Sequence, residues 1–252
     1  MKVIDCYWEL ENLGKKVAEV VIESHDAFDK TEFLRINDNY QYVAVKVPMN
    51  MLSFNFALTD MGYTMIETQI NLSKRYKDFD FNDRLVKHVY PHVNTERIKS
   101  KEELEDIISQ ITPDMFSTDR IYLDPNFPHE ASSKRYINWM RTDYEKGNAV
   151  IVKTFYDDIN VGFGFDHIDE DGTKHGVLGG IFEKYQDMGL GIMTAGLPFM
   201  MAKKRDSPLT VFRTSISSNN PHVWQFYNYL GFKIDKMTYV FVKHNDYNND
   251  SI

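Results

Sequence analysis

Residues 179–196 read GGIFEKYQDMGLGIMTAG, and they join the end of a strand to the start of a helix through a glycine-rich turn. We predict that the strand ends near Phe182, that the turn spans 186–191, and that the helix runs from about Leu190 to Lys204. Backbone N–H groups at a helix start have no acceptor within the helix and lie at the positive end of its dipole. They bind phosphate where glycine lets the backbone come close. A plain strand–helix connection has the same pattern, so this stretch alone leaves both interpretations open.

The sequence around this turn alternates between strand and helix patterns. Upstream lie a predicted helix and three predicted strands, over 129–146, 148–156, 160–168 and 174–182. Downstream lie a predicted strand, a helix and a last strand, over 210–215, 221–230 and to about Lys243. An antiparallel meander that leads into a parallel crossover predicts a mixed sheet. Pro198 lies inside the helix after the turn, where it should kink or shorten that helix.

A second group of residues stands in the stretch SSNNPHVWQFYNYLGFKI, residues 217–234. Asn220 is placed to cap a helix whose first residue is Pro221. Tyr227 falls in the last turn of that helix, and Gly231-Phe232 follows it. Taken alone, Tyr227 is either a core aromatic or a catalytic acid.

Together, the two stretches resemble the GNAT superfamily of N-acetyltransferases. The acyl-CoA loop of that family reads Q/R-x-x-G-x-G/A, and this chain has Gln186, Gly189 and Gly191 at those positions. A later N-x6-Y-x3-G-F pattern of the family matches Asn220 to Phe232. The resemblance covers about residues 115–243. It implies an α+β fold with a mixed, mostly antiparallel central sheet flanked by helices.

The resemblance also implies an acetyl transfer from acetyl-CoA, the cosubstrate, to the primary amine of a small molecule. Tyr227 would be the catalytic acid that gives a proton to the departing thiolate. The cofactor-binding residues would be Ile181, Phe182, Glu183, Gln186, Asp187, Met188, Gly189, Leu190, Gly191 and Asn220. Many members carry a glutamate base in the preceding strand, but residues 177–180 offer no carboxylate. Glu183 and His175 are nearby alternatives with a surface role as the simpler interpretation, and we assign no base.

The first half of the chain reads as a smaller α/β unit. MGYTMIETQINLSK, residues 61–74, aligns with LGFKIDKMTYVFVK, residues 230–243, at the same offset from Gly62 and Gly231. The first half is either a diverged duplicate of the second half or an unrelated unit, and both interpretations remain open. A duplicate would be inactive, because it lacks the glycine loop and has Leu58 where the second half has Tyr227. We predict a smaller, partial GNAT-like domain over 1–112 and a catalytic GNAT domain over 113–252.

This two-part layout is similar to that of TDP-fucosamine acetyltransferase and related sugar-nucleotide N-acetyltransferases. The segment DRIYLDPNFPHEASSKRYINWM, residues 119–140, resembles the opening of their catalytic domain through Arg120, Tyr136 and Trp139. Ile121 departs from an aromatic of that pattern, and helix packing is the simpler interpretation of Tyr136 and Trp139. The likeness makes an amino-sugar acceptor the leading hypothesis. An amino acid, polyamine, antibiotic or peptide amine is an alternative, as is a non-catalytic acyl-CoA-binding module.

Composition narrows the kinds of partner, cellular location and metal site that we expect for the protein. The net charge is −8 with acidic and basic residues interspersed, so we expect no nucleic-acid partner. The start of the chain has no long apolar segment, and no apolar run approaches the ~18 residues of a membrane span, so we expect neither a signal peptide nor a membrane. Cys6 is the single cysteine and the eight histidines are scattered, which favours a cytoplasmic protein with no metal site. A monomer or a homodimer fits these features equally.

Overall fold

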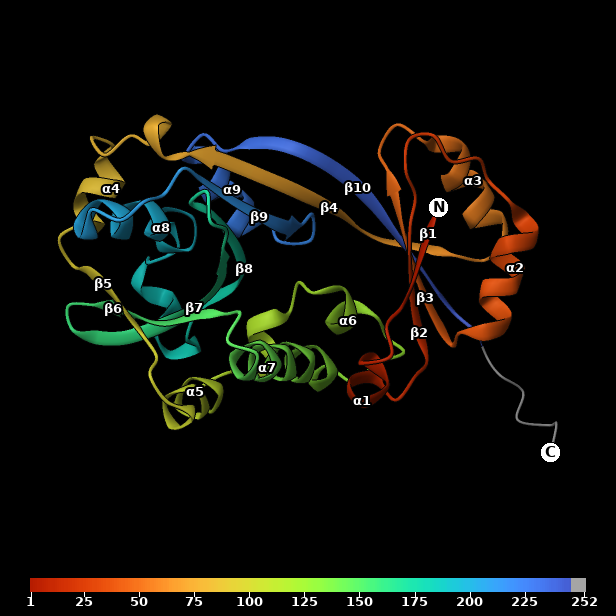
Figure 1. Ribbon diagram of the computed structural model, residues 1–252, viewed down its shortest axis with the longest axis horizontal. Helices are drawn as coiled ribbons and strands as arrows, with labels where there is room; N and C mark the ends of the chain where they lie inside the picture. The colour runs from red at the N-terminus through yellow and green to blue at the C-terminus, as the bar shows by residue number, and fades with distance from the viewer. Residues whose placement is uncertain (246–252) are drawn as a thin grey trace.

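The computed structural model describes residues 1–245, whose strands form one ten-stranded sheet in the order β1-β2-β3-β10-β4-β9-β8-β7-β6-β5 (Figure 1). The strands are β1 (Lys2–Asp5), β2 (Val17–Val21), β3 (Tyr42–Pro48), β4 (Thr64–Arg75), β5 (Val93–Arg97), β6 (Val150–Tyr156), β7 (Ile159–Ile168), β8 (Thr173–Ile181), β9 (Val211–Ser217) and β10 (Lys233–His244). The α-helices are α1 (Glu9–Leu13), α2 (Lys30–Asn39), α3 (Leu52–Asp60), α4 (Arg84–Val89), α5 (Lys101–Ile108), α6 (Arg120–Leu123), α7 (Glu130–Glu145), α8 (Ile192–Arg205) and α9 (Pro221–Tyr229). Three 3-10 helices are η1 (Tyr76–Asp78), η2 (Pro113–Phe116) and η3 (Glu183–Met188).

The predicted α+β fold with a mixed, mostly antiparallel sheet is confirmed. Among the paired neighbours, only β2–β3 and β8–β9 are parallel within residues 1–245. The elements predicted over 129–243 occur in the predicted order, from α7 to β10. Five short strands and α-helices were not predicted, namely β1, α1, α4, β5 and α6, and neither were the three 3-10 helices. Of the five residues in β5, only Val93 and Thr95 are buried, so its alternation is too brief to stand out from a polar stretch.

The last strand of the chain pairs with strands of the first half. β10 lies between β3 and β4, and β4 lies between β10 and β9. Figure 1 shows β4 and β10 as two long strands that run side by side from one half of the molecule to the other. The boundary between residues 112 and 113 stays a prediction. In the structure, strands from both sides of it form one continuous sheet.

The pairing of β4 with β10 is symmetric. Gly62 and Gly231, which precede these strands, both have positive φ, at 80° and 70°. In each strand the residue four positions after that glycine is skipped in the pairing, Ile66 in β4 and Asp235 in β10. A β-bulge at equivalent positions of two strands that pair with each other supports a duplication with exchanged last strands.

Helices cover both faces of the part of the sheet that runs from β4 to β5 in the strand order. On one face, α8 and α9 close a core around Phe199, Phe212 and Phe232. On the other face, α5 and α7 pack over Phe163 and Phe165 of β7. Each such buried apolar side chain contributes about 1.5–3 kcal/mol. No helix within residues 1–245 has the length and apolar character needed to cross a membrane.

Candidate functional site

The site begins where β8 and β9 part. These parallel strands are paired from Thr173–Val211 to Gly176–Thr214 and no further. Beyond that point β8 pairs only with β7, and β9 pairs only with β4. The facing backbone edges of residues 177–181 and 215–217 are therefore open to an extended ligand, which can pair with a free strand edge.

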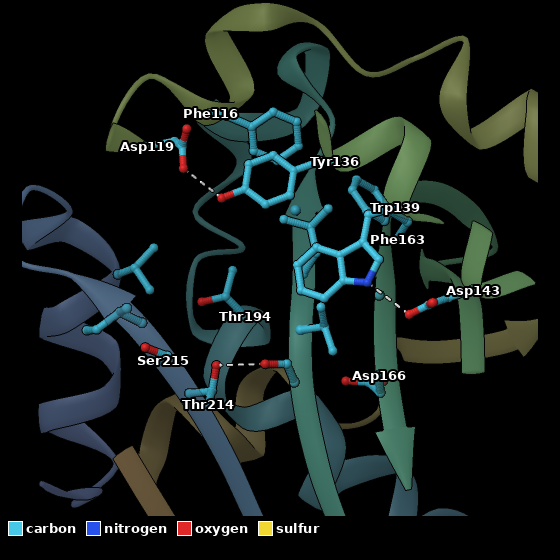
Figure 2. A pocket seen from close by; sticks show the side chains of 18 of the residues that line it. Phe116, Asp119, Tyr136, Trp139, Asp143, Phe163, Asp166, Thr194, Thr214 and Ser215 are labelled. Carbon is cyan, nitrogen blue, oxygen red and sulfur yellow. Dashed lines mark hydrogen bonds between the residues drawn. The ribbon is translucent and has the colours of Figure 1, made fainter. Parts of the chain in front are cut away.

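A cavity of about 1720 Å³ occupies this opening and extends to both faces of the sheet. Figure 2 shows Tyr136 and Trp139 of α7 across the pocket from Thr214 and Ser215 of β9. Tyr136 donates a hydrogen bond to Asp119 at 2.8 Å, which fixes its ring at the wall. The volume exceeds that of an ordinary small-molecule pocket, so it has room for a large and a small ligand together.

The turn between β8 and α8 needs two glycines for different reasons. Gly189 follows η3 with a φ of 72°, a left-handed conformation that glycine adopts without strain. Gly191 precedes α8, and a Cβ there would lie 2.2 Å from Cε2 of Phe226 on α9. A side chain at residue 191 would therefore displace the Phe226 ring, which favours glycine at the capping position of α8.

The start of α8 consequently has free donors. Within residues 1–245, no acceptor takes the backbone N–H of Leu190 or Gly191, and no side chain caps the helix. Unpaired N–H groups at the positive end of a 14-residue helix favour a bound anion.

Tyr227 lies at the junction of α9, α8 and β9. The residue is 5% exposed, and its ring packs edge-on against Phe232 at a centroid distance of 4.7 Å. Its hydroxyl donates to the backbone carbonyl of Thr194 at 3.4 Å. Burial raises the pKa of Tyr227 well above its ordinary value, and the neighbouring Thr214 hydroxyl offsets a part of that shift. The phenol therefore keeps its proton at neutral pH.

Pro198 makes the Thr194 carbonyl available to Tyr227. In an α-helix the N–H of residue 198 would bond to the carbonyl of residue 194, and proline has no N–H. Of the two predicted effects of Pro198, a shortened helix is wrong, because α8 continues to Arg205, and a kink stays a prediction. The turn around Pro198 is held by packing instead, since Phe199 is fully buried in the core between α8 and the sheet.

The predicted site residues fall into two groups. Those that line the cavity are Ile181, Gln186, Gly191, Asn220 and Tyr227. Those that lie in the same turn outside the cavity wall are Phe182, Glu183, Asp187, Met188, Gly189 and Leu190. Asn220 uses its side-chain oxygen to cap α9, accepting from the Val223 N–H at 3.1 Å. Gln186 donates its side-chain amide to the Ile181 carbonyl at 3.4 Å, so that carbonyl is already partly engaged.

Sequence reasoning missed a buried acid in the cavity wall. Asp166 of β7 is 7% exposed and lines the cavity with Lys174, whose Nζ lies 2.8 Å from Oδ2 of Asp166. Burial raises the pKa of Asp166, and the Lys174 ammonium opposes that shift. The signal was an isolated acid in the apolar strand VGFGFDHI, residues 161–168. His175, considered as a base, instead bonds Asp169 at 2.8 Å in the exposed β7–β8 hairpin.

Cys6 also lines the cavity, but burial raises its pKa to about 11, so the thiol stays protonated at neutral pH. Within residues 1–245, no group of three His, Cys, Asp or Glu side chains is arranged to hold a metal ion.

The sequence matches no protein-family model and no curated protein. Solved structures do match. A functionally unknown conserved protein from Staphylococcus epidermidis aligns over 92% of this chain and 85% of its own, with TM-score 0.60 and 12% identity. A tandem GNAT protein from the clavulanic acid biosynthesis pathway aligns over 92% of this chain and 76% of its own, with TM-score 0.53 and 11% identity. The chain has the GNAT fold.

A GCN5-related N-acetyltransferase from Sphaerobacter thermophilus aligns over 82% of this chain, which corresponds to 60% of its own length, with TM-score 0.54 and 8% identity. The tandem neighbour supports a second GNAT-like unit in the first half.

Proposed function

We propose that the protein is an N-acetyltransferase that moves an acetyl group from acetyl-CoA to the primary amine of a small molecule. One observation carries the proposal. The opening between β8 and β9, the uncapped start of α8 and the buried phenol of Tyr227 meet around a single cavity.

The residues fit acetyl-CoA, which supplies a thioester whose carbonyl carbon an amine attacks. The free edges of residues 177–181 and 215–217 would pair with the amide groups of the pantetheine arm. The N–H groups of Leu190 and Gly191 would hold the pyrophosphate, as would the other residues of the turn 186–191. In the reaction a C–N bond forms and the C–S bond breaks. Tyr227 would give its proton to the sulfur and regain one from solvent, while the amine loses its proton to water.

We propose an amino sugar, free or nucleotide-linked, as the leading acceptor. Three residues of the segment that resembles the sugar N-acetyltransferases, Arg120, Tyr136 and Trp139, line the cavity beside the open strands. An amino acid, a polyamine, an antibiotic or a peptide amine is the alternative within the same reaction class. The position of Tyr227 inside the cavity favours an enzyme over a module that only binds acyl-CoA. The proposal includes a cytoplasmic location, and either a monomer or a homodimer.

Thermal unfolding with acetyl-CoA tests the proposal. A ligand at ~100 times its Kd that binds only the native state adds about 2.7 kcal/mol, or roughly 5–10 °C in Tm for a chain of this size. We expect that rise in the wild type and its loss in Gly189→Glu, which puts a carboxylate and a strained φ into the anion-binding turn.

Gly147→Glu is the matched control. Gly147 also has a left-handed φ, at 70°, with open space where a Cβ would be, but it follows α7 and is not part of the turn 186–191 at the start of α8. This variant should lose similar intrinsic stability and keep the rise with acetyl-CoA. No rise in the wild type at millimolar acetyl-CoA contradicts the proposed activity, and a rise that survives in Gly189→Glu contradicts the assignment of the turn.

A further inference from the structure

The cavity continues past the open strands into a charged compartment between the two halves of the chain. Its charged and polar walls are Glu19, Lys46, Glu67, Gln69, Arg120 and Arg135. Figure 1 shows α6, which carries Arg120, below the middle of the long strands β4 and β10. Gln69 of β4 is paired with Ser217 of β9, so the compartment joins the splayed strands directly.

Three of these charged side chains, Glu19, Lys46 and Arg135, already have close partners. The Lys46 ammonium lies 2.9 Å from Glu19. Arg135 donates three hydrogen bonds to the Glu9 carboxylate, at 2.7–3.0 Å. These pairs are closed ionic contacts with the geometry that buried charges require.

Arg120 and Glu67 are different. The guanidinium lies 3.9 Å from Oε1 of Glu67 and 3.9 Å from Oε2 of Glu19, both beyond hydrogen-bond distance. Within residues 1–245, the side chains of Arg120 and Glu67 make no hydrogen bond, and Nε of Arg120 is buried without a partner. The Glu67 side chain is 9% exposed and lines the cavity. Buried charged groups are normally hydrogen-bonded, so this open pair is missing a partner.

The local structure explains why both side chains face the compartment. Asp119 caps α6 by accepting from the Ile121 N–H at 2.9 Å, which fixes Arg120 as the first residue of the helix. In a regular strand, neighbouring residues point to opposite faces. The bulge at Ile66 changes this alternation, so that Ile66 packs against the buried cluster that contains Ile121 of α6 while Glu67 pairs with Arg120 of the same helix.

The charges select the kind of group that fits between them. A carboxylate bound to Arg120 would meet Glu67 and Glu19, and an ammonium bound to Glu67 would meet Arg120. A hydroxyl meets no like charge, because it accepts from the guanidinium and donates to the carboxylate. Tyr7 and Trp8, which are 76% and 48% exposed, also line the cavity and offer flat apolar surfaces to a ring.

We propose that the Glu67–Arg120 pair binds the hydroxyl groups of a polyhydroxylated amine acceptor, such as an amino sugar, and thereby sets acceptor specificity. The inference rests on the proposed acetyl transfer, and it assigns to the first half a part in substrate recognition. Gln69, two residues from Glu67, is paired with Ser217 at the end of β9, whereas Tyr227 lies beside Thr214 nearer the middle of that strand. The pair would therefore bind the part of the acceptor remote from the reacting amine.

The acetylation rates of two acceptors test whether the Glu67–Arg120 pair binds hydroxyl groups. Glucosamine and cyclohexylamine both present an amine on a six-membered ring, and only the first carries hydroxyls. With acetyl-CoA, we expect Glu67→Gln to lower the ratio of their kcat/KM values by about 10–100-fold, the effect of weakening hydrogen bonds to a charged group. Glu170→Gln, at the exposed β7–β8 turn outside the cavity wall, should leave the ratio unchanged. Equal losses for both amines in Glu67→Gln, or a wild type that prefers putrescine or glycine to glucosamine, would overturn the inference.

A binding measurement separates this inference from the proposed activity. Saturation-transfer NMR with N-acetylglucosamine needs no turnover and no acetyl-CoA. Signal in the wild type that is lost in Glu67→Gln supports the pair even if no amine is acetylated, in which case only the proposed activity fails. Equal signal in both proteins, or none in the wild type, contradicts the pair. Arg120→Lys keeps the charge and loses the forked donors, so it should show the same loss if Glu67→Gln does not fold.

Discussion

The two halves of the molecule end in the same order of elements and differ in how their parallel strands pair. In the first half β2-α2-β3-α3 leads into β4, and in the second half β8-α8-β9-α9 leads into β10. Each half has a parallel strand pair joined by a crossover helix, and each gives its last strand to the other. The pair β2–β3 stays paired over all five residues of β2, whereas β8 and β9 part after Gly176. The first half is therefore closed at its parallel strand pair, and the second half is open there.

The helix starts differ in the same way. Asp29 caps α2, accepting from the N–H groups of Thr31 and Glu32 at 2.9 and 3.2 Å. The α8 start has no side-chain cap, because Gly191 packs against Phe226. The donors that an anion would use are therefore already satisfied in the first half. The comparison indicates how the same order of elements can offer a binding site when two kinds of backbone group stay unpaired, a strand edge and a helix start.

Equivalent positions on α3 and α9 give the largest expected contrast. Tyr227→Phe should reduce kcat with acetyl-CoA by about 10²–10⁴-fold, the usual contribution of a general acid, with little change in Tm. Leu58→Ala, at the equivalent position of the first half, should lower stability by about 2–5 kcal/mol, because Leu58 is fully buried. Steady-state kinetics and thermal unfolding of both variants measure the contrast.

The pH profile sharpens this first prediction. Because burial raises the pKa of Tyr227, the protonated form needed for the reaction persists above the ordinary pKa of a phenol, near 10. The rate of the wild type should therefore show no loss from Tyr227 ionisation even near pH 10, where an ordinary phenol is half ionised. If Tyr227→Phe keeps its kcat with an unactivated amine, Tyr227 is not the general acid. The difference between Tyr227 and Leu58 would then be one of packing alone.

Pro198 provides a second contrast, since α2 contains no proline. Pro198→Ala restores a backbone N–H that bonds to the Thr194 carbonyl, the group that now accepts from Tyr227. We expect α8 to become more stable, by up to about 3 kcal/mol, and kcat to fall about tenfold as the phenol loses its partner. A more stable variant with unchanged kcat would show that Thr194 does not position the phenol. Leu197→Ala, one residue earlier, changes the side chain without restoring a backbone donor and serves as the control.

The sequence allowed the open half to be predicted more fully than the contacts between the halves. Tyr227 and the turn 186–191 carry local patterns, and the strand and helix periods around them are long enough to be recognised. The insertion of β10 between β3 and β4 is a choice among distant partners, which no local pattern specifies.

The Glu67–Arg120 pair was missed for the same reason. It depends on a bulge at Ile66 that changes the side-chain alternation of β4, and on the capping of a four-residue helix by Asp119. If residues 63–72 formed a regular strand, Glu67 would lie on the face opposite to Ile66, Ile70 and Leu72. The pair becomes visible only when strand and helix are placed together.

The smallest expected effect concerns the capped helix of the closed half. Asp29→Ala frees the N–H groups of Thr31 and Glu32 and should cost about 1 kcal/mol, or roughly 2–4 °C in Tm. The additional rise with acetyl-CoA should stay unchanged, because a free helix start without open strands beside it cannot hold the rest of the cosubstrate. Asp83→Ala removes a similar cap from α4 and is the control for a general loss of stability. A larger rise in Asp29→Ala alone would mean that the cap is what keeps the first half from binding acetyl-CoA, and that the parting of β8 and β9 is not required.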